Sequence, residues 1–558
     1  MEGVYEYSHW VLWGLVAYML GMLALGWYAS KRIKSSEDYI VAGRGLGLFF
    51  CTGTIFATWF GAGTCMGGAG NAYLFGNQGV LFDPWAAGLS LLVVGFAFAR
   101  LLRRGKFLTA VDMLDKRFGK KMGAISAIVL SIADTGWLAS LLVAFGAILH
   151  YFTGVSLNTA IVVSTLVVMV YTYMGGMWAV SLTDAVQMVI LIISLIIMLI
   201  MVWPEAGGFA SFFSNEPANF YGINQWSFLP ISQAAQHPEY QNAGFFYYVG
   251  HKAWFYWAAA WLSLGLGSLP FQTLVQRFLA AKSETVAVRS GYLSALLYVS
   301  IGLIPIFLGM IYFRVNPDLS INSALNNILL YMAVDHLPLA VTIIFIIALV
   351  AAIMSSADSV ILGVSTLCCN NVWRYFRPEL TDKDLLKGTK RMVPVVALVA
   401  LLMALFAKAI FNLMIVVSIL GMVSIAIPFV AAWFWKKANH YGAIASAIGG
   451  LVGWAAGYFY YLPFTMEANT GVIVEGQVYF EWAMWDAVYI GSIWGVILSI
   501  IALVAVSLLT QKIDAPKPLV DADNKPLTVE NWIGIPWNNS DKKEDVPDGE
   551  LESADIAV

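Results

Sequence analysis

A row of small and hydroxyl-bearing side chains lies at residues 351–359, inside the apolar run 336–368. Helical residues three and four positions apart are neighbours, so a helix would line up one alanine and three serines, with Asp358 beside them. Polar residues within a membrane-spanning helix are costly and by default mark an ion or substrate path. Serines alone would suit close packing of helices, but the aspartate favours an ion site. The residues of this face are Ala352, Ser355, Ser356 and Ser359.

The composition of the chain points to a membrane as its surroundings. Of the 558 residues, 60% are hydrophobic and 12% are charged, whereas a soluble protein carries about twice that charged share. Many apolar runs reach the roughly 20 residues that cross a bilayer as a helix. We therefore predict an all-α polytopic membrane protein of the cell (inner) membrane with thirteen transmembrane helices. The predicted spans are 8–29, 46–72, 79–102, 122–152, 157–175, 180–203, 252–277, 288–314, 336–368, 390–408, 411–435, 440–462 and 486–510.

The basic residues are unevenly divided between the two sides that successive spans define. All but three of the 31 Lys and Arg residues fall on one side, the exceptions being Lys252, Arg314 and Lys408. Because Lys and Arg are enriched in cytoplasmic loops, we predict the N-terminus outside and the C-terminus in the cytoplasm. The tail 511–558 is rich in Pro, Asp and Glu and is predicted to be disordered.

Glycine and proline interrupt two of the spans. Span 46–72 is rich in glycine, and span 252–277 contains Gly265 and Gly267 followed by Pro270. Broken backbone frees carbonyl groups that can bind a cation, and it is tolerated at membrane depth only where it lines a cavity. These are the second and seventh spans, so we predict two five-helix repeats in opposite orientations, an arrangement typical of secondary transporters. The predicted parts are an extra helix with its loop (1–45), the first repeat (46–203), an outside loop (204–251), the second repeat (252–435), two further helices (436–510) and the tail (511–558).

Several short motifs are spread along spans two to twelve. They are ATWFGAG at 57–63, YTYMGG at 171–176, TDAVQ at 183–187, QRFLAA at 276–281 and AIMSSADS at 352–359. In combination they resemble the sodium/solute symporter family. Within that family, TW at 58–59, MSSADS at 354–359 and NHYGA at 439–443 look most like the high-affinity choline transporter branch. The resemblance implies a leucine-transporter-type fold and solute uptake coupled to sodium entry.

The resemblance also implies a sodium site between spans two and nine. Carried over by position, its carbonyl ligands are those of Cys51, Thr54 and Ala352, and its hydroxyl ligands are Ser355 and Ser356. All of these are neutral oxygen ligands, which suit a hard monovalent cation that must be released in every cycle.

A second sodium site, nearer the cytoplasm, is implied for some members of the family. Here its residues would be Asp184, Asp358 and Ser359. At 1.5 Å per helical residue, both aspartates lie roughly 9–11 Å to the cytoplasmic side of the centres of their spans. The alternative for Asp184 is a carboxylate at a helix end that caps the helix or faces the cytosol.

Two tryptophans, Trp59 and Trp137, lie at the middle of their spans, away from the interfaces where tryptophan is common. Such residues often serve only packing. The resemblance, however, implies an aromatic cage that would hold a trimethylammonium group by cation–π attraction. Both tryptophans match cage positions, and Phe271 matches a third that is tryptophan in choline transporters.

Other cage positions depart from the choline transporter pattern. A fourth aromatic position, tyrosine in choline transporters, falls at Ala87, although Trp85 is close in sequence. Asp134, one turn before Trp137, matches an acidic residue that could balance the charge of the ligand. The changes at Ala87 and Phe271 leave room for another quaternary ammonium compound or a different small solute.

The predicted function is a sodium-coupled symporter that imports a small organic solute by alternating access. Choline or a related quaternary ammonium compound fits best, and the alternative is a sugar, an amino acid or a monocarboxylate. We find no Lys or Arg at the middle of spans two to eleven, which disfavours multiply charged anions. No pore-lining ring, nucleophile or metal motif indicates a channel or an enzyme, and no nucleic-acid partner is expected. The expected partners are the co-transported sodium ion, the solute and the lipid bilayer.

Overall fold

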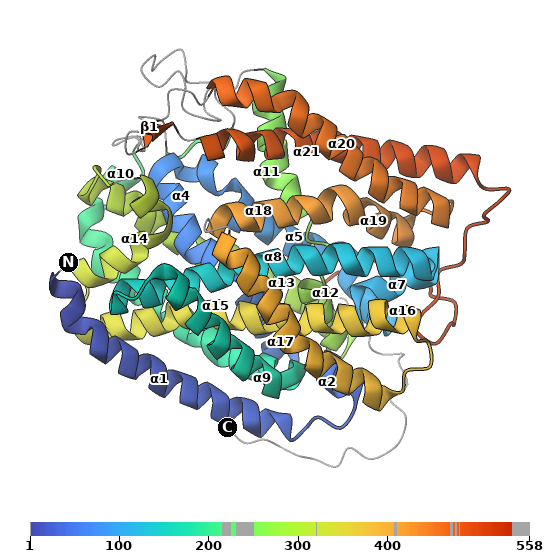
Figure 1. Ribbon diagram of the computed structural model, residues 1–558, viewed down its shortest axis with the longest axis horizontal. Helices are drawn as coiled ribbons and strands as arrows, with labels where there is room; N and C mark the ends of the chain where they lie inside the picture. Colours follow the sequence, from blue (N-terminus) through green and yellow to red (C-terminus); the bar gives the residue numbers. More distant parts are fainter. Residues whose placement is uncertain are drawn as a thin grey trace.

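The computed structural model describes residues 2–214, 225–229, 250–319, 321–406, 410–468, 473–474, 477–478 and 480–537. These residues are almost entirely helical, and the long helices run in roughly one direction across the view in Figure 1. Ten helical segments among them are long and apolar enough to cross a membrane, and two shorter apolar helices accompany them at Leu48–Trp59 and Leu157–Val170. The all-helical polytopic class predicted from composition is therefore confirmed.

The first half of the chain forms ten helices. A long helix at the edge of the molecule, α1, packs against α9 and α15 (Figure 1). The helix α9 changes direction at Gly176. Glycine suits this position for two reasons: its φ is 59°, and a Cβ there would lie 2.6 Å from the Tyr39 ring. The helices are α1 (Glu2–Ser30), α2 (Ser36–Val41), α3 (Leu48–Trp59), α4 (Gly68–Phe75), α5 (Ala87–Val93), α6 (Ala99–Gly105), α7 (Ala110–Phe118), α8 (Lys120–Thr153), α9 (Leu157–Val202) and α10 (Phe209–Phe212).

The second half continues with α11 to α21 and a two-stranded antiparallel hairpin. The last two helices, α20 and α21, pack against each other along the upper edge in Figure 1. The helices are α11 (His251–Gly265), α12 (Gln272–Ala280), α13 (Glu284–Val315), α14 (Ile321–His336), α15 (Leu339–Leu367), α16 (Arg374–Phe376), α17 (Asp382–Phe406), α18 (Ile410–Gly421), α19 (Ile427–Phe434), α20 (His440–Ala468) and α21 (Phe480–Leu509). The strands are β1 (Ile473–Val474) and β2 (Gln477–Val478).

The two breaks predicted from glycine and proline are present. The second predicted span is divided into α3 and α4, with a π-helical turn at Gly63–Gly67 between them. The seventh is divided into α11 and α12, separated by residues 266–271. At the first break a Cβ on Gly61 would lie 2.7 Å from Ser356 Oγ, so glycine there allows α15 to approach the broken backbone.

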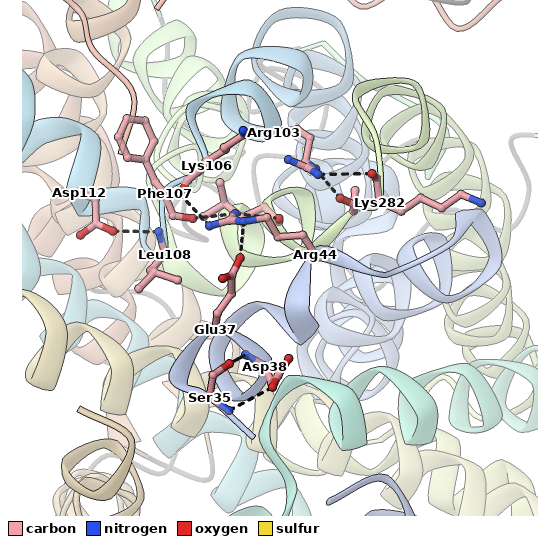
Figure 2. Close-up of polar contacts among 12 residues, drawn as sticks. Ser35, Glu37, Asp38, Arg44, Arg103, Lys106, Phe107, Leu108, Asp112 and Lys282 are labelled. Atoms are coloured by element: carbon pink, nitrogen blue, oxygen red, sulfur yellow. Dashed lines mark hydrogen bonds and ion pairs between the residues drawn. The ribbon is translucent and has the colours of Figure 1, made fainter. Parts of the chain in front are cut away.

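Polar contacts join three connecting segments of the chain (Figure 2). Arg44, between α2 and α3, forms an ion pair with Glu37 at 2.8 Å and donates a hydrogen bond to the Lys106 carbonyl at 2.7 Å. Arg103, at the end of α6, donates to the Ala281 carbonyl at 2.5 Å. The segments after α2, α6 and α12 therefore lie on one face, as the predicted alternation of spans requires.

The tail beyond α21 differs from its prediction in the part that the structure describes. Residues 511–537 pack along the ends of several helices, and the ring of Trp532 lies 6.1 Å from that of Phe96 and 4.9 Å from that of Phe434. Four arginines, of which Arg100 and Arg117 are buried, supply polar contacts that composition did not reveal, because their guanidinium groups donate to carbonyl oxygens of the tail. These pairs are Arg100 with Asn531, Arg104 with Thr528 and Glu530, Arg117 with Lys517, and Arg289 with Pro536. Residues 538–558 lie outside the described part, as does most of the loop 204–251.

Candidate functional site

The hydroxyl face of α15 lies directly against the end of α3. Ser355 Oγ is 2.9 Å from the Ala57 carbonyl oxygen and 2.9 Å from the Ala352 carbonyl oxygen. Ser356 Oγ donates to the same Ala352 carbonyl at 3.2 Å. Both serines are fully buried. The helices α3 and α15, which are about three hundred residues apart in the chain and were predicted to form one site, are therefore in contact.

The carbonyl of Ala57 is available because the helix ends there. In an unbroken helix the Gly61 N–H would bond to it, but in this structure Gly61 N–H donates to the Trp59 carbonyl at 2.9 Å. The Ser355 hydroxyl donates to the Ala57 carbonyl in place of the Gly61 N–H. A free carbonyl oxygen beside hydroxyl groups can coordinate a sodium ion at a broken membrane helix.

Cys51 and Thr54 lie further back in α3, one to two turns before the break. The Thr54 hydroxyl donates to Asp184 Oδ2 at 2.5 Å, and Cys51 Sγ lies 3.5 Å from the Arg277 carbonyl. Both side chains are fully buried. The side chain of Thr54 therefore belongs to a second polar cluster, and the α3 carbonyl that contacts Ser355 is that of Ala57.

This second cluster contains the three residues expected at the second sodium site. Asp184 comes from α9 and is held by Thr54, and Ser359 from α15 lies 3.1 Å from the hydroxyl of Thr58. Ser359 Oγ also donates to Asp358 Oδ1 at 3.3 Å. None of these side chains is more than 1% exposed. Two threonines of α3 thus bring together the polar residues of α9 and α15.

A buried arginine, Arg277 of α12, shares the cluster. Its guanidinium group donates to Ser359 Oγ, and it interacts electrostatically with Asp184, Asp358 and Asp134. The sequence analysis had placed this residue at the end of a span, but its side chain is fully buried. These carboxyl groups and the guanidinium are buried together, where an uncompensated charge of either sign would be costly.

A separate cavity with aromatic walls lies between the broken helices. The rings of Trp59 and Trp137 are 6.4 Å apart with an interplanar angle of 73°, an edge-to-face arrangement. The cavity is narrow in this structure, with a volume of about 20 Å³ open to a water-sized molecule. Its lining residues are Trp59, Asp83, Trp137, Leu264, Phe271, Tyr298, Met414 and Ser418. Three of the predicted cage residues thus line one cavity.

The other three residues predicted for the substrate lie elsewhere. The Trp85 ring packs edge-to-face on Phe228, with centroids 5.0 Å apart. Ala87 is fully buried at the start of α5. Asp134 is also fully buried, but its electrostatic partner is Arg277 and it does not line the cavity.

The carboxylate that does line the cavity is Asp83, which the sequence analysis did not single out. Asp83 Oδ2 accepts a hydrogen bond from Thr64 at 2.7 Å, and Asp83 Oδ1 lies 2.9 Å from the Tyr298 hydroxyl. The two hydroxyls are 2.7 Å apart, and Tyr298 is also 3.0 Å from the Trp59 carbonyl. A signal was available, because Asp83 lies within the apolar run 79–102, and an acidic residue inside a span is by default functional.

Comparison with proteins of known sequence and structure places this geometry in a class. The chain is similar in fold to a Na⁺-coupled sialic acid symporter solved in a substrate-bound outward-open state, with a TM-score of 0.68 and 20% identity over 92% of this chain and 99% of that one. Its fold is thus of the leucine-transporter type. The sequence pattern of the sodium:solute symporter family matches residues 39–450, and the chain belongs to that family.

Relatives within the family transport different solutes. The chain is 28% identical over 455 residues to the human high affinity choline transporter 1, covering 78% of this chain and 75% of that one. It is 26% identical over 491 residues to the sodium/proline symporter of Escherichia coli, covering 82% and 91% of the two chains. The protein is therefore a multi-pass, sodium-coupled solute symporter and not an enzyme, and sodium is its co-transported ion.

Proposed function

We propose that this symporter imports choline or a related quaternary ammonium compound together with sodium. The observation that carries the proposal is the cavity between Trp59, Trp137 and Phe271, whose aromatic walls match a cationic head group. A cation over a desolvated aromatic face gains about 2 kcal/mol or more. The described lining residues include no Lys or Arg that would bind the carboxylate of an anionic solute. This argues against the alternative of a monocarboxylate.

The first sodium ion would bind where α15 meets the broken end of α3. Ser355, Ser356 and the Ala352 carbonyl provide oxygens there, in support of the ligands that the family resemblance implies. We add the Ala57 carbonyl, since it already faces the Ser355 hydroxyl. The carbonyls of Cys51 and Thr54, one to two turns earlier in α3, complete the proposed set.

A second sodium ion would bind at the cluster of Asp184, Asp358 and Ser359. The support is that carboxyl and hydroxyl groups of α3, α9 and α15 meet in this buried region. A sodium ion there would compensate the charge of a carboxylate.

We also propose thirteen spans, with the N-terminus outside and the C-terminus cytoplasmic. Helical segments occupy every predicted span, including both halves of α9 on either side of Gly176. The N-terminal end of α1 lies with α10 and α14 at one end of the molecule, and α2, α7 and α16 lie at the other (Figure 1). The proposed repeats comprise 46–203 and 252–435, flanked by 1–45, the loop 204–251, 436–510 and the tail 511–558.

The proposed mechanism is alternating access with mutual stabilisation of the ligands. Sodium between α3 and α15 would hold the broken end of α3, which carries Trp59, and so preorganise the cavity. Bound sodium then raises the affinity for the solute, and bound solute must raise the affinity for sodium by the same factor. Opening to the cytoplasm would release both.

Uptake of labelled choline into proteoliposomes tests this proposal. We expect saturable choline uptake driven by an inward sodium gradient, absent when potassium replaces sodium. Trp137→Ala should weaken choline binding by roughly 10-fold or more, since one wall of the cavity is lost. Trp13→Ala is the matched control, because Trp13 is 69% exposed on α1. Sodium-driven uptake of proline or a sugar, without choline binding, would overturn the proposed substrate.

A further inference from the structure

Asp83 presents a carboxyl group to the cavity, and none of the salt bridges among the described residues includes it. Its side chain is 1% exposed, and it lines the same cavity as Trp59, Trp137 and Phe271. A buried charge that the protein does not pair is costly unless a ligand or a proton compensates it.

The carboxylate is held in place from two sides. Thr64 follows the break in α3 and contacts Asp83 Oδ2, whereas Tyr298 of α13 contacts Asp83 Oδ1. Each carboxylate oxygen thus lies within hydrogen-bond distance of a neutral hydroxyl group, and neither hydroxyl carries a charge that could balance that of a carboxylate. The orientation of Asp83 is therefore set by the protein, while its electrostatic complement is missing.

The other acidic residue near the cage, Asp134, does not line the cavity. It interacts electrostatically with Arg277, whose guanidinium contacts Ser359 of the second cluster. Of the two carboxylates, only Asp83 combines a place in the cavity wall with the absence of a salt bridge.

We propose that Asp83 is the residue by which this transporter recognises positive charge: its carboxylate is the counter-charge of the solute's cationic group. The proposal rests on the proposed function and adds the residue that selects a cation over a neutral molecule of the same shape. A quaternary ammonium group donates no hydrogen bonds, so it needs a nearby charge and aromatic faces, and the cavity offers both. The proposal also removes Asp134 from that role.

A pair of ligands that differ only in charge tests the proposal. Choline and its uncharged carbon analogue, in which a carbon atom replaces the nitrogen, have nearly the same shape. Equilibrium binding of both is measured to the purified full-length protein in saturating sodium. We expect the wild-type protein to prefer choline strongly, and Asp83→Asn to weaken choline binding by about 10- to 100-fold while changing binding of the carbon analogue by less than about 3-fold.

The controls separate this role from a structural one. Asp83→Glu keeps the charge and should restore most of the preference for choline, and sodium-dependent thermal stabilisation should persist in both variants if they are folded. Should Asp83→Asn fail to fold, Tyr298→Phe keeps the carboxylate but removes one of its hydrogen bonds, and the preference for choline should fall several-fold.

Three results would overturn the proposal. They are an equal loss of both ligands in Asp83→Asn, an unchanged choline affinity in that variant, and an unchanged preference in Tyr298→Phe when Asp83→Asn does not fold. If the wild-type protein binds neither ligand, the proposed substrate is wrong, and that result is seen without any variant.

Discussion

Ser355 is the residue on which the proposed sodium site depends most directly. Its hydroxyl lies between two carbonyl oxygens, that of Ala57 on α3 and that of Ala352 on its own helix. Gly61 makes the contact between the two helices close, because any side chain there would meet Ser356. One buried hydroxyl thus links the ion site to the broken backbone that carries Trp59.

Replacing Ser355 by alanine removes a proposed ligand and leaves the Ala57 carbonyl without its hydroxyl partner. We expect the sodium concentration for half-maximal choline uptake to rise by about 10-fold, equivalent to about 1.4 kcal/mol. The sodium dependence of uptake in proteoliposomes measures this. Ser365→Ala is the matched control, since Ser365 is buried on the same helix, away from the row of hydroxyls. Equal effects of the two substitutions would argue against the site.

Asp184 tests the second sodium ion. Asp184→Asn keeps the shape of the side chain but removes one of three carboxylates that face Arg277. We expect a shallower sodium dependence of uptake and a half-maximal sodium concentration raised by about 5-fold or more. Glu205→Gln, an exposed carboxylate between α9 and α10, should leave both unchanged. An unaltered sodium dependence in Asp184→Asn would remove this ion from the mechanism.

At the scale of elements, two broken helices each carry one of the aromatic walls of the cavity. Trp59 is the last residue of α3, and Phe271 immediately precedes α12. Gly421 of α18 has to be glycine where it faces this break, because a Cβ would lie 2.4 Å from the Phe271 ring. The breaks therefore do two things at once, since they free backbone carbonyls and direct side chains into the same cavity.

Phe271→Leu tests the contribution of the second break. Leucine keeps an apolar side chain but removes the aromatic face, so we expect choline affinity to fall by about 10- to 30-fold. Competition binding in saturating sodium measures the change. Phe278→Leu, on the same helix and equally buried but outside the cavity, should change choline affinity by less than about 2-fold. Similar losses in both variants would indicate a packing role for Phe271.

At the scale of the whole molecule, the tail ties the ends of several helices together. Its backbone carbonyls accept hydrogen bonds from arginines on α6, α7 and α13. Arg100 and Arg117 are 1% and 3% exposed, so these donors have little access to water. A buried donor left without a partner costs about 1–3 kcal/mol, and the tail removes several such costs.

Two truncations test this role of the tail. Ending the chain after Ala515 removes the carbonyl partners and Trp532, and we expect the melting temperature of the purified protein to fall by about 3 °C or more. Ending the chain after Trp537 retains every described contact and should leave the melting temperature unchanged. Equal melting temperatures for the two truncated proteins would show that these contacts do not stabilise the fold.

The sequence predicted much of the architecture because helices in a membrane leave a local signature. Apolar runs predicted the spans, glycine and proline predicted both breaks, and the spacing of the serines predicted the hydroxyl face of α15. Trp59 and Trp137 stood out because they lie far from the interfaces. Each of these inferences needs only the periodicity and composition of one segment.

Four features emerged only from the tertiary structure: Asp83 in the cavity wall, its hydrogen bond to Tyr298, the contact of the buried Arg277 with Ser359, and the packing of residues 511–537. Each depends on which side chains meet across helices that are far apart in the chain. A helical pattern gives the direction of a side chain around its own axis, but the residue opposite it is decided by the packing of the neighbouring helix. The sequence alone thus determined the class of the protein and the segments proposed to form its sites, whereas packing decided which carboxylate faces the aromatic cavity.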